Sequence, residues 1–411
     1  MSAFPWALAI FYILAGRVII RSTRGVGRQV LFAALNLASF YWFFVHGRGK
    51  RETLTFGIYL GIVLVQYLTM RILAEKKDWK MWVAFLTPIL ALVLIRYVPV
   101  SLYAHVSGGF ARLLREEPAF SFAPYFLGIS YLAFRASHLV LEVRNGAVEK
   151  PGIWEYFGFC FFVPTMSVGP INPYHHYRQA FASEPPSFPL ERSLTRILVG
   201  LVKYQFLGKL CDQLTYSGLL MDEHYHRWMD LPVAAVFYYL YLFCNFSGVC
   251  DVAIGVAGLM GIPVAENFQS PFGARNVKEF WNRWHITLSL YLREVVFVPL
   301  SKFLAHLFGP ANVNHAIAGA ITVTFLLVGL WHGLAWNFIL FGALHALGNV
   351  VNHYYTIGLK KWLGAARFKA YNANPYIRAA AVVVTFCYVA ATMFCFANSL
   401  PEMKDILSSL R

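Results

Sequence analysis

Charged residues are scarce in this chain. Only 13% of its 411 residues are Asp, Glu, Lys or Arg, whereas 58% are hydrophobic. A soluble globular protein carries roughly 25% charged residues, so this chain lacks the charge needed to cover a water-facing surface. Within a membrane the backbone N–H and C=O groups must find hydrogen-bond partners inside the protein, and helices provide them. The composition therefore predicts an all-α protein that crosses a membrane several times.

Acidic residues are rarer than basic ones. The 35 Lys and Arg outnumber the 20 Asp and Glu, which gives a formal net charge of +15. In a soluble protein this excess of basic residues would suggest binding to nucleic acid. Here, basic loops that face anionic lipid and the cytoplasm explain it more simply. An acidic soluble partner is an additional interpretation. We therefore expect contact with a lipid bilayer and no nucleic acid.

Several motifs of soluble enzymes and metal sites are missing. The six cysteines form no C-x-x-C pair, and Cys and His show no metal-ligand spacing, so we expect neither a disulfide framework nor a metal. There is no G-x-S-x-G nucleophile elbow, no phosphate-binding loop and no histidine with Asp five residues later. An enzyme built on this chain has no obvious covalent nucleophile, which favours direct transfer assisted by a base.

Long apolar stretches are abundant. A membrane span needs about 20 predominantly apolar residues, and roughly 10 to 12 stretches approach that length. The candidates are 5–20, 30–44, 54–70, 81–98, 120–141, 153–168, 194–210, 231–243, 249–262, 316–330, 336–351 and 379–397. Several are interrupted by Pro or Gly, which is tolerated at membrane depth where a segment lines an enclosed site. We expect one domain over residues 1–411.

The first candidate site segment is 278–300, KEFWNRWHITLSLYLREVVFVPL. It is dense in polar groups and suits an amphipathic or re-entrant helix near the interface. It contains His285, which is either functional or a structural histidine held within a buried turn. The adjacent Asn282, Arg283 and Trp284 are candidate substrate contacts, with simple packing as the alternative.

The second candidate segment is 325–344, FLLVGLWHGLAWNFILFGAL, in which His332 is the sole ionisable residue. An ionisable group at membrane depth is costly and indicates function by default. Burial favours the neutral imidazole that a general base requires. Trp331 beside it is a candidate substrate contact. The alternative is a packing histidine held by a neighbouring carbonyl.

A third segment, 244–255 (CNFSGVCDVAIG), places polar Asn245 and Asp251 in apolar surroundings. Both are weaker candidates for the substrate site, and Asp251 is also a candidate carboxylate for orienting a histidine. Helix packing and local hydrogen bonding are the favoured alternative for this segment.

These segments resemble the membrane-bound O-acyltransferase superfamily. The resemblance rests on FWNRWHITLSLYLRE (280–294) and GLWHGLAWNFILFGALHAL (329–347), each with a Trp-His pair, and more weakly on 162–181 and 241–272. It covers residues 120–350 and is strongest with the bacterial branch. Within that branch, LGISYLAFRASHLVLEVRNG (127–146) is similar to the D-alanyl transfer proteins of the teichoic-acid pathway.

The resemblance implies a ring of helices around a central funnel and tunnel in the bacterial cytoplasmic membrane. It assigns the catalytic histidine to His332 and the second family histidine to His285. The chain departs from the bacterial pattern at Arg293–Glu294, where Arg-Asp is usual, and at Asn245, where Asp is usual. These departures bear on the subfamily, and therefore on the acyl group.

The resemblance also implies the substrates. The donor would be a thioester on the phosphopantetheine arm of a small acidic acyl carrier protein on the cytoplasmic side. The acceptor would be a hydroxyl on an envelope polymer or on an intermediate membrane protein, and no cofactor would be resident. Two alternatives stay open: O-acetylation of an exopolysaccharide or peptidoglycan, and a transporter with intramembrane histidines. The transporter lacks support because no paired interrupted segments recur in two halves of the chain.

Overall fold

The computed structural model describes residues 6–47, 52–75, 79–97, 126–186, 188–221 and 224–411. Helices are the regular structure of these residues, apart from two isolated β-bridges. The prediction of an all-α protein is therefore confirmed. The chain divides into two compact units, Met1–Leu198 with Cys250–Ala265, and Val199–Val249 with Glu266–Arg411. The prediction of a single domain stays a prediction.

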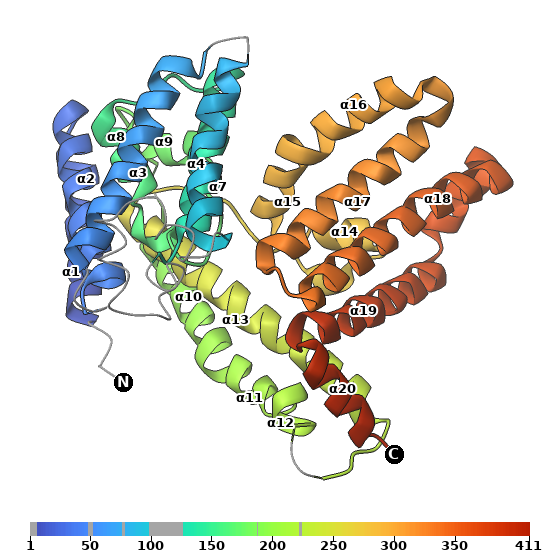
Figure 1. Ribbon diagram of the computed structural model, residues 1–411. Coiled ribbons are helices and arrows are strands. Elements are labelled where there is room, and N and C mark those ends of the chain that lie inside the picture. The colour runs from blue at the N-terminus through green and yellow to red at the C-terminus, as the bar shows by residue number, and fades with distance from the viewer. Residues whose placement is uncertain (1–5, 48–51, 76–78, 98–125, 187, 222–223) are drawn as a thin grey trace, which may run out of the picture. The chain divides into compact units, whose positions relative to one another are not determined.

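The first unit is built from membrane helices and shorter connecting helices (Figure 1). They are α1 (Trp6–Ser22), α2 (Gly25–Phe40), a π-helix (Tyr41–Val45), α3 (Glu52–Leu73), α4 (Lys80–Tyr97), α7 (Ile129–Arg144), α8 (Ile153–Cys160), α9 (Tyr174–Arg178) and most of α10 (Leu190–Leu201). Arg135 of α7 is 1% exposed, and its guanidinium donates to the carbonyl oxygens of Phe159 and Cys160. This buried cation has a structural explanation, because backbone acceptors surround it.

The second unit contains both histidine segments. Its helices are a π-helix (Val202–Leu207), α11 (Gly208–Asp212), α12 (Tyr216–Leu219), most of α13 (Asp230–Met260), α14 (Val277–Trp281), α15 (Ile286–Leu292), a π-helix (Arg293–Phe297), α16 (Val298–Phe308), α17 (Val313–His332), α18 (Trp336–Ala373), α19 (Pro375–Ala397) and α20 (Leu400–Ser409). The expected amphipathic segment 278–300 thus contains one break, because the chain turns after Trp281 and then continues from α15 through the π-helix Arg293–Phe297 into α16.

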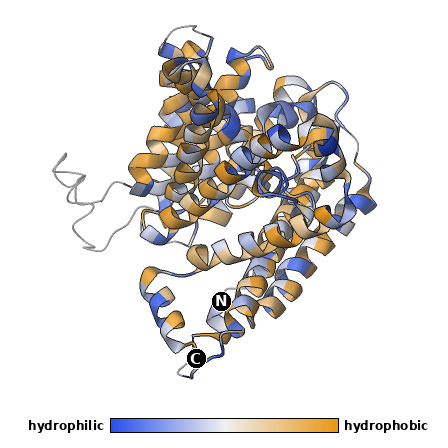
Figure 2. Ribbon diagram, turned by 90° about the vertical axis from the view of Figure 1, so that its right-hand side faces the viewer, coloured by the Kyte–Doolittle hydropathy of each residue, from blue (hydrophilic) through white to orange (hydrophobic). Residues whose placement is uncertain are grey.

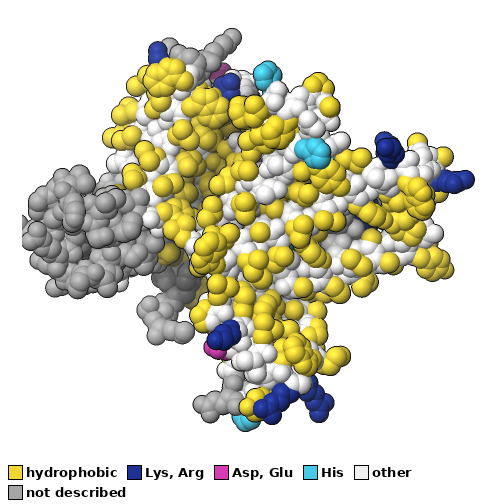
Figure 3. Space-filling model, turned by 45° about the vertical axis from the view of Figure 1, so that its right-hand side comes forward, with side chains coloured by type: hydrophobic (Ala, Val, Ile, Leu, Met, Phe, Trp, Pro, Cys, Tyr) yellow, Lys and Arg dark blue, Asp and Glu magenta, His cyan; other side chains and the backbone are white. Residues whose placement is uncertain are grey.

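Six helices of the described residues are long and apolar enough to cross a membrane. They are Gly25–Val45, Glu52–Leu73, Lys80–Tyr97, Asp230–Met260, Pro310–His332 and Pro375–Ala397. Hydrophobic residues run along the helices (Figure 2), and hydrophobic side chains cover most of the face seen in Figure 3, where Lys and Arg are few. Val384 of α19, for example, is 68% exposed. Such surfaces are stable in lipid, which confirms a multi-pass membrane protein.

Some expected spans differ from the observed helices. The stretches 231–243 and 249–262 form the single helix α13, because the intervening Gly248 serves close packing: a Cβ there would lie 2.8 Å from the carbonyl oxygen of Gly200. In the expected span 153–168, only the eight residues of α8 form an α-helix. Part of the expected span 120–141 lies outside the described residues.

Helices α17 and α18 form an antiparallel pair that carries His332 at its turn (Figure 1). Two glycines allow their backbones to approach closely. A Cβ on Gly329 would lie 2.3 Å from the carbonyl oxygen of Phe338, and a Cβ on Gly342 would lie 2.5 Å from that of Phe325. Small residues at such contacts are typical of helix pairs in membranes. The position of His332 therefore depends on this contact.

We expect Gly342→Ala to destabilise the protein by about 1–3 kcal/mol, because the added methyl group collides with rigid backbone. The matched control is Gly358→Ala in the same helix, where a Cβ meets nothing within 4 Å. Alanine favours the helix there, so the free energy of unfolding of the control should equal that of wild type or exceed it by up to ~1 kcal/mol. Thermal unfolding of the detergent-solubilised protein measures both. Equal midpoints for Gly342→Ala and wild type would contradict the close approach.

Candidate functional site

His285 has an unusual backbone conformation. It directly precedes α15 with φ of 45°, and only one other non-glycine residue in the described chain, Ser270, has a positive φ. Side chains disfavour this left-handed region, so the conformation stores strain that the surrounding structure must hold. Such residues concentrate at functional sites, which singles out this turn.

A short antiparallel pairing holds the turn in place. Phe268 and Trp284 form an isolated bridge, and the backbone N–H of Gln269 donates to the carbonyl oxygen of Arg283 at 2.9 Å. The N–H of Ile286 donates to the carbonyl oxygen of Asn267 at 3.0 Å. The strained backbone is therefore fixed by a segment about 18 residues earlier in the chain.

The side chain of Asn267 sets the tautomer of His285. Its Oδ1 accepts from the Thr287 backbone N–H at 3.2 Å and from the Thr287 hydroxyl at 2.9 Å, and it lies 3.2 Å from His285 Nδ1. A backbone N–H can only donate, so the amide atom facing these groups is the oxygen. His285 Nδ1 must then carry the proton, and Nε2 presents its lone pair.

The free nitrogen of His285 is buried. The residue is 4% exposed, and Nε2 has no hydrogen-bond partner among the described residues. Burial, followed by the nearby His332, lowers the pKa of His285 to about 3. The imidazole is therefore neutral at pH 7. A buried, unpaired acceptor costs about 1–3 kcal/mol, so it suits a place where substrate completes the hydrogen bond.

His332 lies at the last position of α17 and is half-buried. Its ring packs edge-on against Phe396, with centroids 4.8 Å apart. The Trp331 ring lies 4.6 Å from that of His332 and 6.2 Å from that of His285. The structure therefore brings the two Trp-His segments, 47 positions apart in sequence, into one cluster.

The neighbours of His285 differ in their surroundings. Asn282 is exposed and follows α14. Arg283 donates to Glu279 at 2.6 Å, and Trp284 is 5% exposed within an aromatic cluster that includes Phe280 and Tyr239. These contacts account for Arg283 and Trp284 structurally. Their contact with substrate stays a prediction.

The two weaker candidates lie on α13. Asn245 is half-buried near Gly208, where an added Cβ would lie 3.8 Å from its amide carbon. Asp251 belongs to the first unit and forms an ion pair with Arg196 at 3.0 Å. The ion pair supports the structural alternative for Asp251. Contact of either residue with substrate stays a prediction.

Sequence reasoning assigned no role to His345, which is fully buried. Its Nδ1 accepts from the indole N–H of Trp281 at 3.1 Å, and its Nε2 lies 3.0 Å from the Thr392 hydroxyl. That hydroxyl donates to the carbonyl oxygen of Val389, so it accepts from His345. Both ring nitrogens are satisfied, and His345 ties α14, α18 and α19 together. The only signal in the sequence was its place at the end of the second Trp-His motif.

We expect Asn267→Asp to shift the acid limb of the pH–activity profile to higher pH. A carboxylate beside Nδ1 favours the imidazolium and raises the pKa of His285 from its depressed value of about 3. Activity that needs neutral His285 is full above the new pKa and is lost as pH falls through it. Rates of acyl transfer between pH 4 and 8 measure the shift.

Thr287→Val is the matched control, because it removes one donor from the same oxygen and adds no charge. Its profile should keep the wild-type acid limb. A wild-type acid limb in active, folded Asn267→Asp would show that the protonation of His285 does not limit the reaction.

The sequence also matches known proteins. The model of the MBOAT, membrane-bound O-acyltransferase family, matches residues 68–395. A teichoic acid D-alanyltransferase from Streptococcus thermophilus is 32% identical over 68% of this chain and 69% of its own length. The enzyme of the same name from Bacillus subtilis is 30% identical over 66% and 69%. A peptidoglycan O-acetyltransferase from Helicobacter pylori is 37% identical over 51% of this chain and 39% of its own length.

Proposed function

This chain belongs to the membrane-bound O-acyltransferase family, and from that premise we propose that it transfers a D-alanyl group to a teichoic acid-type envelope polymer. It is an O-acyltransferase that crosses the bacterial cytoplasmic membrane several times. The observation that carries the proposal is the cluster of His285, Trp331 and His332. Relatives named teichoic acid D-alanyltransferase support the D-alanyl group.

In the proposed reaction, His332 acts as the general base. It takes the proton of the acceptor hydroxyl as the oxygen attacks the carbonyl carbon of the donor thioester. The carbon–sulfur bond then breaks, and the leaving thiolate takes the proton from His332, so the histidine returns to its neutral form. General-base assistance of this kind contributes roughly 10²–10⁴-fold in rate. A half-buried imidazole among Phe338, Phe341 and Phe396 suits this role.

His285 positions a substrate in this scheme. Its Nε2 lone pair can accept a hydrogen bond, but a neutral imidazole in this tautomer cannot donate from Nε2 to an oxyanion. Positioning is therefore favoured over stabilisation of the tetrahedral oxyanion. The partner would be an N–H or O–H of either substrate other than the reacting hydroxyl. Correct placement of two substrates supplies much of the remaining rate.

The proposed donor is the phosphopantetheine thioester of an acidic acyl carrier protein, delivered from the cytoplasm. The net charge of +15 favours association with such a partner. The acceptor is an envelope polymer or an intermediate membrane protein on the outer side. O-acetylation is the second candidate, because the Helicobacter pylori peptidoglycan O-acetyltransferase is 37% identical over its matched part.

We expect His332→Ala to lower acyl transfer by at least about 100-fold, because the general base is lost. The assay follows label transfer from a D-alanyl carrier thioester in proteoliposomes. The matched control is His46→Ala, which removes an exposed histidine whose pairing with Glu52 contributes little. It should retain wild-type turnover.

Thermal unfolding verifies that each variant is folded. Equal turnover of His332→Ala and wild type would exclude His332 as the base. Turnover of acetyl donors, with none of D-alanyl donors, would assign the reaction to the O-acetyltransferase branch.

A further inference from the structure

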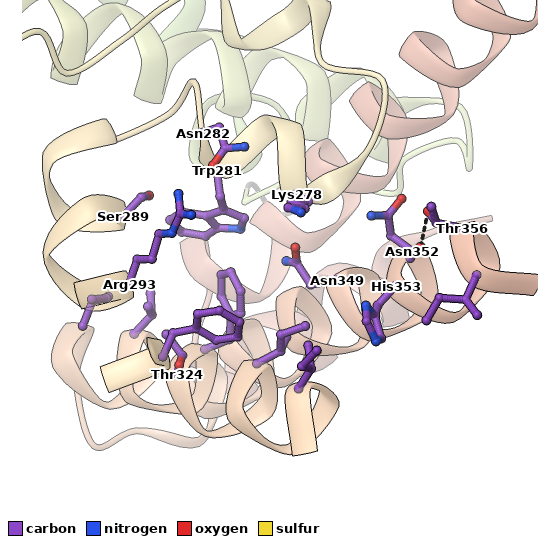
Figure 4. Close-up of a pocket in the computed structure, with 17 residues that line it drawn as sticks. Lys278, Trp281, Asn282, Ser289, Arg293, Thr324, Asn349, Asn352, His353 and Thr356 are labelled. Carbon is purple, nitrogen blue, oxygen red and sulfur yellow. Dashed lines mark hydrogen bonds between the residues drawn. The ribbon is translucent and has the colours of Figure 1, made fainter. Parts of the chain in front are cut away.

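The second unit contains a cavity of about 530 Å³ that neither His285 nor His332 lines. Side chains from α14, α15, α17 and α18 enclose it (Figure 4). Its volume lies in the range of small-molecule sites, about 300–1,000 Å³. It is therefore large enough for a ligand of its own.

Two exposed cations line this cavity. Lys278 comes from α14, and Arg293 comes from the residue after α15 (Figure 4). The lining includes no carboxylate, and neither cation forms an ion pair within the described residues. Glu279 beside Lys278 is occupied by Arg275 and Arg283. The cavity is therefore electropositive and suits an anionic group.

Neutral polar groups extend the electropositive end. Amide side chains of Asn282 and Asn352 line it, and His353 Nε2 is buried without a hydrogen-bond partner in the described chain. Burial, followed by the charge of Lys278, lowers the pKa of His353. A neutral imidazole can donate one hydrogen bond to an anionic oxygen. The polar groups therefore complement the two cations.

The rest of the cavity is apolar. Ile317, Ile321, Phe325 and Val328 line it from α17, spaced along one face of the helix. Eleven helical steps cover about 16 Å at 1.5 Å per residue. Because α17 is one of the apolar helices long enough to cross a membrane, an apolar chain that follows it would lie at membrane depth. The ligand should thus join an anionic group to an apolar chain.

We propose that this cavity binds an anionic glycerophospholipid, with its phosphate against Lys278 and Arg293 and one acyl chain along α17. Arginine and lysine both recognise phosphate, and basic pockets between membrane helices bind anionic lipid headgroups. A soluble phosphate ester would pair with the same cations but would leave the apolar face of α17, about 16 Å long at 1.5 Å per residue, uncovered. The inference does not rest on the D-alanyl reaction.

Native mass spectrometry of the delipidated protein, titrated with phosphatidylglycerol, tests the proposal. We expect Lys278→Gln combined with Arg293→Gln to weaken binding about tenfold, a loss of roughly 1.4 kcal/mol. The matched control is Lys360→Gln with Lys361→Gln, which removes the same charge from exposed positions of α18 outside the cavity. That control should bind as wild type does. Phosphatidylcholine should bind more weakly than phosphatidylglycerol to the wild type.

A second variant, Ile321→Trp, fills the apolar part and leaves both cations in place. It should also weaken phosphatidylglycerol binding, with thermal unfolding confirming the fold. Equal losses in the two charge variants would show unspecific attraction and overturn the proposal. Displacement of phosphatidylglycerol by free phosphopantetheine at equal concentration would assign the cavity to a soluble phosphate ester and overturn the lipid assignment. If Ile321→Trp does not fold, the two charge variants decide alone.

Discussion

The site depends on one amide oxygen. Asn267 Oδ1 accepts from two groups of Thr287 and from His285 Nδ1, so it fixes both the strained turn and the tautomer of the imidazole. Without this oxygen, either ring nitrogen of His285 could carry the proton. With it, the lone pair is always on Nε2. The Asn267 oxygen therefore determines that His285 presents a hydrogen-bond acceptor, and not a donor, at Nε2.

The two buried histidines of the second unit show why this matters. His345 has partners at both ring nitrogens, which stabilises the contact between three helices. His285 has a partner at one nitrogen only, and the other is buried. Buried polar groups are nearly always hydrogen-bonded in folded proteins, so the exception requires an explanation. We propose that a substrate completes the bond at Nε2.

The sequence predicted the class and the two Trp-His segments, because composition and intramembrane histidines are local signals. It could not predict Asn267, which lies in an irregular loop where no periodicity marks a partner for His285. It assigned 231–243 and 249–262 to two spans, whereas the polar residues between them lie within the single helix α13, where Gly248 packs closely against Gly200. It treated Lys278 as a polar residue of an amphipathic segment and Arg293 as part of a departure from the bacterial pattern, and it predicted no cavity between them. Each of these depends on tertiary contacts.

The second unit separates two kinds of polar site within the same short helices. Around His285 and His332 the polar groups are imidazoles packed against aromatic rings. Lys278 and Arg293 are exposed cations that line a cavity with an apolar wall. A cation close to His332 would disfavour the protonated imidazole that forms during transfer. Placing phosphate-binding charge in a cavity that neither histidine lines therefore allows an anionic ligand and a histidine base within one unit.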